Sequence, residues 1–273
     1  GGSLDYIPYR FGGFGQSLGG VEGQPVLVEQ TFIERQTSAG GTGLVAYPFS
    51  RATRAEFGAG GRHIRFTRDL QTDIYSLATG QQIERIEENL PAGDSLALFD
   101  AGAALVHDTS IFGATSPILG RRFRFDFTQT AGSLTYSNFI ADVRQYWMPV
   151  RPFTLAVRGL AFGRFGRDAD DQRLRWTYLG ESYLVRGYDV GSFEASECQP
   201  GAAGSCQAFD QLVGTRMLVA NAELRFPLWG VLGGDNFYGP LPVEMAVFAD
   251  GGVAWDNVSR PSLADGNREF VRS

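Results

Sequence analysis

One arginine and two acidic residues have the side chains that could build a functional site in this sequence. Arg186 lies in a short motif made of Val185, Arg186, Gly187 and Tyr188. The glycine allows a positive φ or a close backbone approach, and the tyrosine adds a rigid ring with a polar tip. Glu223 and Asp250 lie on the polar sides of two later segments. Because a guanidinium presents a fork of donors, it can bind two carboxylates. The alternative is three unrelated charges in contact with water.

No group of residues forms a catalytic constellation. His63 and His107 have no G-x-S-x-G sequence or comparable nucleophile beside them. Ser110 follows His107 by three positions, which places the two on opposite faces of a strand. A phospholipase built on a β-sheet needs such a serine close to a histidine. We therefore predict that the protein is not an enzyme.

Metal ligands are equally sparse. The two cysteines and two histidines are too far apart to form a metal site. The run Asp168-Ala-Asp-Asp171 lacks the glycine and the closing glutamate of a calcium loop, so we interpret it as the solvated tip of a hairpin. We predict neither a metal site nor a cofactor.

The two cysteines could instead form a disulfide. Cys198 and Cys206 lie eight positions apart in a segment rich in Gly, Ser and Ala. Exposed free thiols are a liability, and disulfides persist in oxidising compartments such as the cell surface. We predict an intraloop disulfide on the cell-surface side. Two free thiols in a reducing compartment are the alternative.

Composition limits the class of protein. The chain of 273 residues has a net charge of −6 and a pI of about 5.0, which argues against a nucleic-acid partner. All 24 basic residues are arginine, which we interpret mainly as a bias of genome composition, although arginine also suits paired sites shielded from water. No apolar run reaches the ~18 residues of a transmembrane helix. A membrane barrel would have the same mean hydropathy as a soluble protein, because its lipid-facing and lumen-facing residues average out.

Apolar and polar residues alternate with a period of two through the second half of the chain, which predicts strands. Phe123, Phe125 and Phe127 alternate with Arg122, Arg124 and Asp126. The same alternation separates Leu218, Leu224 and Phe226 from Glu223, and Val247 from Asp250. Strands of ~10 residues with one continuous apolar face are typical of membrane barrels.

A soluble β-sandwich alternates in the same way, and the pattern alone favours it. Two further features favour a membrane barrel. The polar faces carry many arginines, which suits a wide, water-filled interior. The apolar faces end in aromatic residues, as they do at membrane interfaces; these are Trp147, Trp176, Tyr178 and Trp255. A sheet that spans lipid must close, because an open edge leaves unpaired backbone groups in hydrocarbon.

The N-terminal part of the chain is less regular. We expect residues 1–25 to be irregular or the remains of a hairpin. Strands are expected over residues 26–34 and 42–47, with a bulge or turn at Gly40-Gly41 between them. Further strands are expected over residues 72–85, 96–107 and 174–178, with a loop over 87–94. In all, the chain should form about ten strands, by period-two alternation and turn signals.

Three motifs in the second half resemble those of a known family. They are Val185-Arg-Gly-Tyr188, Asn221-Ala-Glu-Leu-Arg-Phe-Pro227 and Phe248-Ala-Asp-Gly-Gly-Val-Ala-Trp255. Their order is that of the BamA-like barrels, the outer-membrane protein-assembly and translocation superfamily, also called bacterial surface antigens. The resemblance covers about residues 110–258 and includes Gly120-Arg-Arg-Phe123.

The resemblance implies an all-β, antiparallel transmembrane barrel of the sixteen-stranded type, in the outer membrane of a Gram-negative bacterium. It also implies that Arg186 lies on a loop folded into the barrel and reaches Glu223 and Asp250, whose side chains face the lumen. Residues 1–273 would then be part of one barrel domain. The resembled barrels have sixteen strands, an even number as in other bacterial barrels, whereas this chain has about ten. The N-terminal strands, any periplasmic domains and about the last three strands would therefore be missing.

The implied function is the insertion, assembly or translocation of proteins at the outer membrane. The implied partners are outer-membrane lipid, client outer-membrane or secreted polypeptides, and periplasmic or lipoprotein components. A two-partner-type polypeptide secretion pore and a passive, porin-like or structural barrel are the alternatives. Periplasmic domains in the full-length sequence would distinguish the first two.

Overall fold

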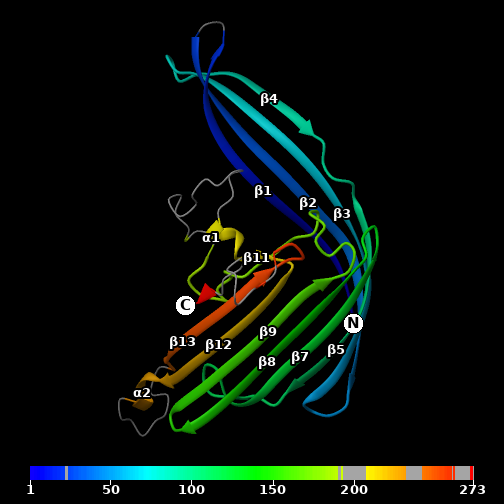
Figure 1. Ribbon diagram of the computed structural model, residues 1–273, viewed down its shortest axis with the longest axis vertical. Helices are drawn as coiled ribbons and strands as arrows, with labels where there is room; N and C mark the ends of the chain where they lie inside the picture. Colours follow the sequence, from blue (N-terminus) through cyan, green and yellow to red (C-terminus); the bar gives the residue numbers. More distant parts are fainter. Residues whose placement is uncertain are drawn as a thin grey trace. The chain divides into compact units, whose positions relative to one another are not determined.

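The computed structural model describes residues 1–21, 24–189, 192, 207–231, 242–259, 261 and 271–272. One sheet dominates the described residues, in the strand order β1-β2-β3-β5-β7-β8-β9-β12-β13-β14, with β4 paired to β3 and β6 to β7 (Figure 1). Strands β10 and β11 form a separate two-stranded sheet. The predicted all-β antiparallel fold is confirmed. Among the described residues, no helix is long and apolar enough to cross a membrane.

The elements have the following bounds. The first strands are β1 (Gly2–Val21), β2 (Gln24–Pro48), β3 (Thr53–Ser76), β4 (Gln82–Leu90), β5 (Leu96–Asp108) and β6 (Ile111–Phe112). Next come β7 (Pro117–Gly132), β8 (Tyr136–Val150), β9 (Phe153–Phe165) and β10 (Thr177–Tyr178). The last are α1 (Gln207–Asp210), β11 (Val213–Gly214), β12 (Arg216–Pro227), α2 (Leu228–Val231), β13 (Glu244–Trp255) and β14 (Val271–Arg272).

The chain forms two compact units. The first comprises Gly1–Gly43, Ala59–Asp100 and Ala131–Leu134. The second comprises Leu44–Gly58, Ala101–Thr130 and Thr135–Ser273. All the candidate residues Arg186, Glu223 and Asp250 belong to the second unit.

Three expectations for the first unit are wrong. Residues 2–21 are not irregular but form β1, which pairs with β2 along its whole length. No bulge or turn interrupts β2, because Leu4 and Asp5 pair with Gly41 and Gly40 in one unbroken register. The expected strand over residues 72–85 ends at Ser76, and the expected loop over 87–94 begins as β4, which pairs with β3. Glycines in these segments have no side chain and therefore interrupt the alternation that predicts a strand. The hydrogen bonds between strands still form, because they join backbone groups.

The predicted division into an apolar and a polar face is confirmed in the second unit. Directly paired residues share a face, and Phe123, Phe125 and Phe127 pair with Val143, Ala141 and Phe139. On the opposite face, Arg122 and Arg124 pair with Arg144 and Asp142. Glu223 and Asp250 lie on this second side too, which we call the polar face. The apolar face is the other side of β7, β8, β9, β12 and β13.

Candidate functional site

A long connection between β9 and β12 covers part of the polar face. Its described parts carry β10, β11 and the motif around Arg186, and Figure 1 shows this segment beside β12 and β13. Leu179, Leu184, Val185 and Leu212 of this connection are at most 5% exposed. They pack with three strand residues of the polar face, Met217, Val219 and Ala254. This apolar contact fixes the connection to the sheet.

Two glycines let the backbone of this connection approach closely. A Cβ on Gly252 of β13 would lie 2.9 Å from Leu179 Cδ1 and 3.1 Å from Val185 Cγ2. A Cβ on Gly180 would overlap the carbonyl oxygen of Tyr188. A side chain at either position would force neighbouring atoms to move, so glycine fits both. These two glycines therefore allow the connection between β9 and β12 to pack closely on β13.

Arg186 contacts both predicted acids. Its Nε and Nη2 donate to the two carboxylate oxygens of Asp250 at 2.5 and 2.7 Å, which is a bidentate pair. Its Nη1 lies 2.8 Å from Glu223 Oε1. The Asp250 side chain is 0% exposed, whereas that of Arg186 is 29% exposed. Gly187 follows with a φ of +88°, a left-handed conformation that glycine adopts without strain.

Three further residues complete this cluster. Arg225, on the face of Glu223, is expected from the sequence to compete for that carboxylate, whereas Asn221 and Phe248 were not predicted to take part. Asn221 Nδ2 donates to Asp250 Oδ1 at 2.9 Å and to the carbonyl of Leu184 at 2.7 Å, so it ties the loop to the strand. The Arg186 guanidinium lies 3.6 Å from the centre of the Phe248 ring, within cation–π range. Arg225 Nε donates to Glu223 Oε2 at 2.6 Å. The signal was present, because Asn221 and Phe248 begin the two family motifs.

Tyr188 and Tyr178 hold the segment that follows Arg186. The Tyr178 hydroxyl donates to the carbonyl of Tyr188, and the Tyr188 hydroxyl donates to the carbonyl of Arg272 in β14 at 2.8 Å. Burial raises the pKa of Tyr178, and the nearby carboxylates of Asp189 and Glu181 raise it further. The phenol therefore keeps the proton that it donates.

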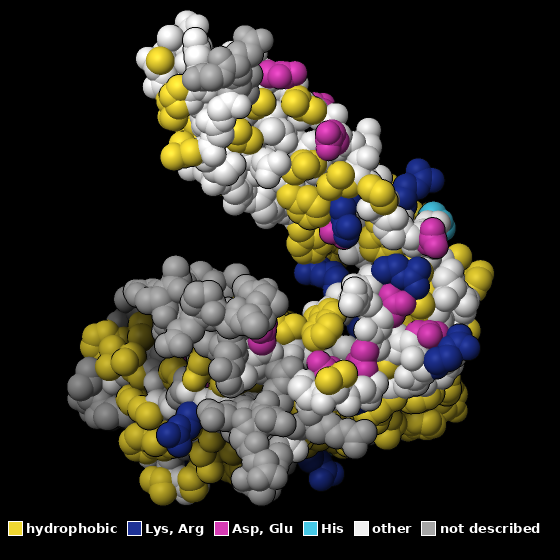
Figure 2. Space-filling model, turned by 45° about the horizontal axis from the view of Figure 1, so that its top comes forward, with side chains coloured by type: hydrophobic (Ala, Val, Ile, Leu, Met, Phe, Trp, Pro, Cys, Tyr) yellow, Lys and Arg dark blue, Asp and Glu magenta, His cyan; other side chains and the backbone are white. Residues whose placement is uncertain are grey.

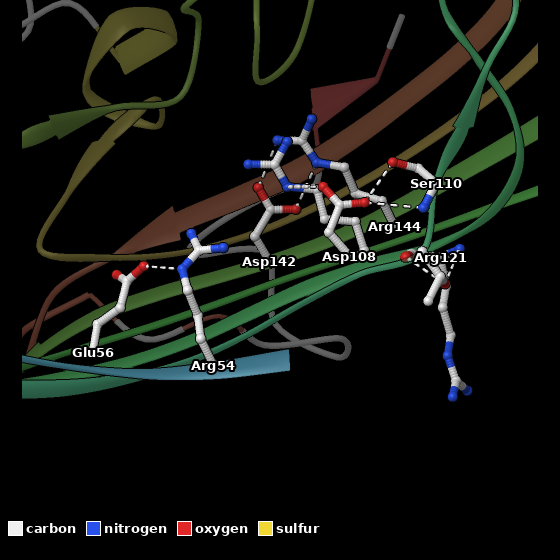
Figure 3. Close-up of polar contacts among 9 residues, drawn as sticks. Arg54, Glu56, Asp108, Ser110, Arg121, Asp142 and Arg144 are labelled. Carbon is white, nitrogen blue, oxygen red and sulfur yellow. Dashed lines mark hydrogen bonds and ion pairs between the residues drawn. The ribbon is translucent and has the colours of Figure 1, made fainter. Parts of the chain in front are cut away.

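A second group of charges lies next to this cluster on the polar face. Asp142 accepts two hydrogen bonds from Arg144, at 3.0 and 2.7 Å, and two from Arg158, at 3.2 and 2.9 Å. Figure 3 shows Asp142 beside Arg144, with Glu56 and Arg54 on a neighbouring part of the sheet. Arg158 Nη1 also donates to the carbonyl of Tyr183 at 2.7 Å. The loop is thus held to β9 as well as to β12 and β13.

The other residues that could serve in catalysis or metal binding do not lie close together. His107 Nδ1 lies 2.8 Å from Thr53 Oγ1, whereas Ser110 donates to Asp108. In the described part of the chain, no three His, Cys, Asp or Glu side chains are grouped to hold a metal ion. Cys198 and Cys206, predicted to form a disulfide, lie outside the described residues.

The expected strand over residues 174–178 is also wrong, because only Thr177–Tyr178 forms a short strand, paired with β11. The acidic run before it is engaged within the protein. Asp168 accepts from the Thr135 amide at 2.7 Å, Asp170 from the Thr215 hydroxyl at 2.6 Å, and Asp171 from Arg173 at 2.9 Å. This segment serves to fasten the connection.

Comparisons with known proteins identify the family and the fold of the chain. A family model described as the Omp85 superfamily domain matches residues 31–270. No curated protein matches the chain. The crystal structure of BamA from Haemophilus ducreyi lacking POTRA domains 1-3 is similar in fold, with a TM-score of 0.57 and 15% sequence identity. The match covers 94% of this chain and 53% of that one, so the chain spans about half the length of that protein. Because the family model covers most of its residues, the chain belongs to the Omp85 superfamily of outer-membrane barrel proteins.

Proposed function

We propose that this chain forms part of one transmembrane barrel and that the protein assists the insertion, assembly or translocation of other proteins at the outer membrane. Omp85 proteins are generally non-enzymatic membrane barrels that interact with client polypeptides. The observation that carries the proposal for this chain is the loop held against the polar face by Arg186, Asp250 and Glu223. In a barrel, the polar face would be the lumen.

The exposed apolar face supports a location in lipid. Phe125, Phe127, Leu218, Leu224 and Val247 are between 39% and 65% exposed. Hydrophobic side chains occupy wide areas of the surface visible in Figure 2. Soluble monomers rarely expose apolar patches of more than a few hundred Å², and larger patches mark membrane or protein contacts.

The charge cluster offers a physical role for the loop. A loop tip held by one cation and two carboxylates stays on the polar face, where it narrows and shapes the space that a client would meet. The ladder of the sheet does not depend on this contact. Release of the loop from the polar face is therefore expected to impair the insertion or translocation of client polypeptides, while the barrel wall remains folded.

An arginine on the apolar face is expected to destabilise the protein in lipid. Phe125→Arg places a charge among lipid tails, which costs about 2–4 kcal/mol at the centre of a bilayer. Thr128→Arg in the same strand, on the polar face, is the matched control and is expected to cost much less. Urea titration of both variants in phospholipid vesicles measures the difference. Equal stability of the two variants would contradict a lipid location for the apolar face.

The proposed function is tested with the full-length gene product in phospholipid vesicles. The probe is an eight-stranded outer-membrane barrel, added unfolded in urea, and its folding is followed by its altered migration in unheated gels. We expect faster folding in vesicles that contain the protein than in empty vesicles. Arg186→Ala should lose most of this gain. Arg85→Ala should keep it, because the Arg85 side chain is half exposed and its partner Asp73, in the first unit, still accepts hydrogen bonds from Gln71 and Gln82.

Two further measurements in the same vesicles distinguish the alternative functions. A secretion pore would carry an unfolded polypeptide into the vesicle, where added protease cannot reach it, without speeding the folding of the barrel probe. A passive barrel would admit small sugars and do neither. Either pattern would contradict an insertion role.

A further inference from the structure

A cavity lies between the loop tip and the polar face. It has a volume of about 250 Å³, and its lining includes Ser182 and Tyr183 of the loop together with side chains of β8, β9 and β12. Four of the lining residues are arginines, namely Arg144, Arg158, Arg186 and Arg225. Their side chains are between 17% and 36% exposed. The cavity thus brings four partly buried guanidinium groups around one small space.

The carboxylates that contact these arginines are fewer than the arginines. Asp250 and Glu223 bind Arg186, and Glu223 also binds Arg225, so these two acids balance two cations. Asp142 alone binds both Arg144 and Arg158. Among the described residues, four positive charges against three negative charges leave one positive charge in excess at the cavity.

The ion pairs on neighbouring strands of the polar face, within the part of the second unit that the structure describes, are balanced, which makes the excess local. Arg54 and Arg124 bind Glu56, and Arg124 also binds Asp126, so two cations meet two acids. Arg122 pairs with Asp108. The excess charge around Asp142 therefore has no counterpart in these neighbouring pairs. Two partly buried cations that share one carboxylate are incompletely neutralised, which is costly and attracts a further anion.

We propose that this cavity binds one carboxylate group between the guanidinium groups of Arg144, Arg158 and Arg225. Planar guanidinium forks match the geometry of a carboxylate. One excess charge is neutralised by a single carboxylate, whereas phosphate, with a second pKa near 6, carries about 1.5 to 2 charges at pH 7. The carboxylate belongs either to a free small acid or to an Asp or Glu side chain of a polypeptide. The site stands on the cavity and its charges and does not depend on the proposed function.

The binding is tested on the full-length gene product in detergent micelles, with ¹³C-acetate as the probe and NMR line broadening as the signal. Arg144→Gln removes the excess charge and leaves the Arg158–Asp142 pair. We expect acetate affinity to fall about tenfold or more, as for the loss of one charge-assisted hydrogen bond. Arg122→Gln, at a pair outside the cavity lining, is the control and should keep the affinity of the wild type.

A second variant keeps every arginine. Ser182→Asp supplies a resident carboxylate to the cavity, so acetate binding should be lost although the fold is intact. Capped peptides Gly-Glu-Gly and Gly-Gln-Gly identify the source of the carboxylate. If the glutamate peptide competes with acetate and the glutamine peptide does not, the site also accepts acidic side chains of a polypeptide. Competition by free acids but by neither peptide restricts it to small acids and still supports the carboxylate site.

Three results would overturn the proposal. Acetate affinity that is the same in the wild type, Arg144→Gln and Ser182→Asp would show that the cavity is not the binding site. No detectable acetate binding by the wild type would show that the excess charge attracts no carboxylate. Inorganic phosphate that binds more tightly than acetate at pH 7 would show that the charge count does not select a single carboxylate.

Discussion

Arg186→Ala is expected to release the loop that carries it and to leave the barrel wall folded. The substitution removes the cation that pairs with the buried carboxylate of Asp250, which keeps the Asn221 amide as a donor, and it leaves Glu223 with Arg225. Breaking a fully buried pair costs ~3–5 kcal/mol. Because the Arg186 side chain is 29% exposed, we expect about 2 kcal/mol, between the values for surface and buried pairs. Hydrogen exchange of the amides over residues 179–188 measures the loss of loop protection.

The control and the rescue for this variant use the same measurement. Arg122→Ala removes an arginine of the polar face that pairs with Asp108, outside the connection, and it should leave hydrogen exchange over residues 179–188 unchanged. The double variant that swaps the two charges, Arg186→Glu with Asp250→Arg, should restore part of the protection because an ion pair can form again. The restoration should be incomplete because the fork of donors then lies on the opposite partner. Protection in Arg186→Ala equal to that of the wild type would contradict a holding role for the pair.

Gly252→Val is expected to push the loop off the strand without touching any charge. The added Cβ would lie 3.0 Å from the carbonyl oxygen of Leu218 and 2.9 Å from Leu179 Cδ1. The two further methyl groups of valine need space that Leu179 and Val185 occupy. Overpacking of this kind costs typically about 1–3 kcal/mol. Hydrogen exchange over residues 179–188 should rise, as it does for Arg186→Ala.

The neighbouring glycine provides a matched control. Gly251 lies on the opposite face of the same strand, and a Cβ there would meet only the carbonyl oxygen of Val271, at 3.6 Å, an ordinary contact. Gly251→Val should therefore be tolerated, since valine favours strands. If both variants exposed the loop equally, the effect would come from the strand backbone and not from the packing of the loop.

The fold was predictable from the sequence where side chains alternate without interruption. Phe123, Phe125 and Phe127 and their polar neighbours specify strand and face together, because a slip of one residue would exchange the two faces. The first strand, β1, was missed for the converse reason. Glycines spread through residues 2–21 weaken the alternation, and the strand there follows from pairing with β2, which a local pattern does not reveal.

The site was predictable only in part. The family motifs indicated Arg186, Glu223 and Asp250, which the structure places in contact. Asn221 and Phe248 stand in the same motifs, but their contacts with Leu184, Asp250 and Arg186 depend on where the loop lies. The double engagement of Asp142 by Arg144 and Arg158 follows from the register of β8 with β9, which pairs the two arginines. Local sequence does not specify that register.

A double-mutant cycle on Arg186 and Asp250 tests the central claim, that their contact holds the loop on the polar face. Hydrogen exchange over residues 179–188 gives the free energy of loop opening for the wild type, Arg186→Ala, Asp250→Ala and the double variant. We predict a coupling energy of at least about 1.5 kcal/mol, as measured for close charge pairs. Effects of the two substitutions that add to within about 0.5 kcal/mol, as for independent sites, would contradict the claim.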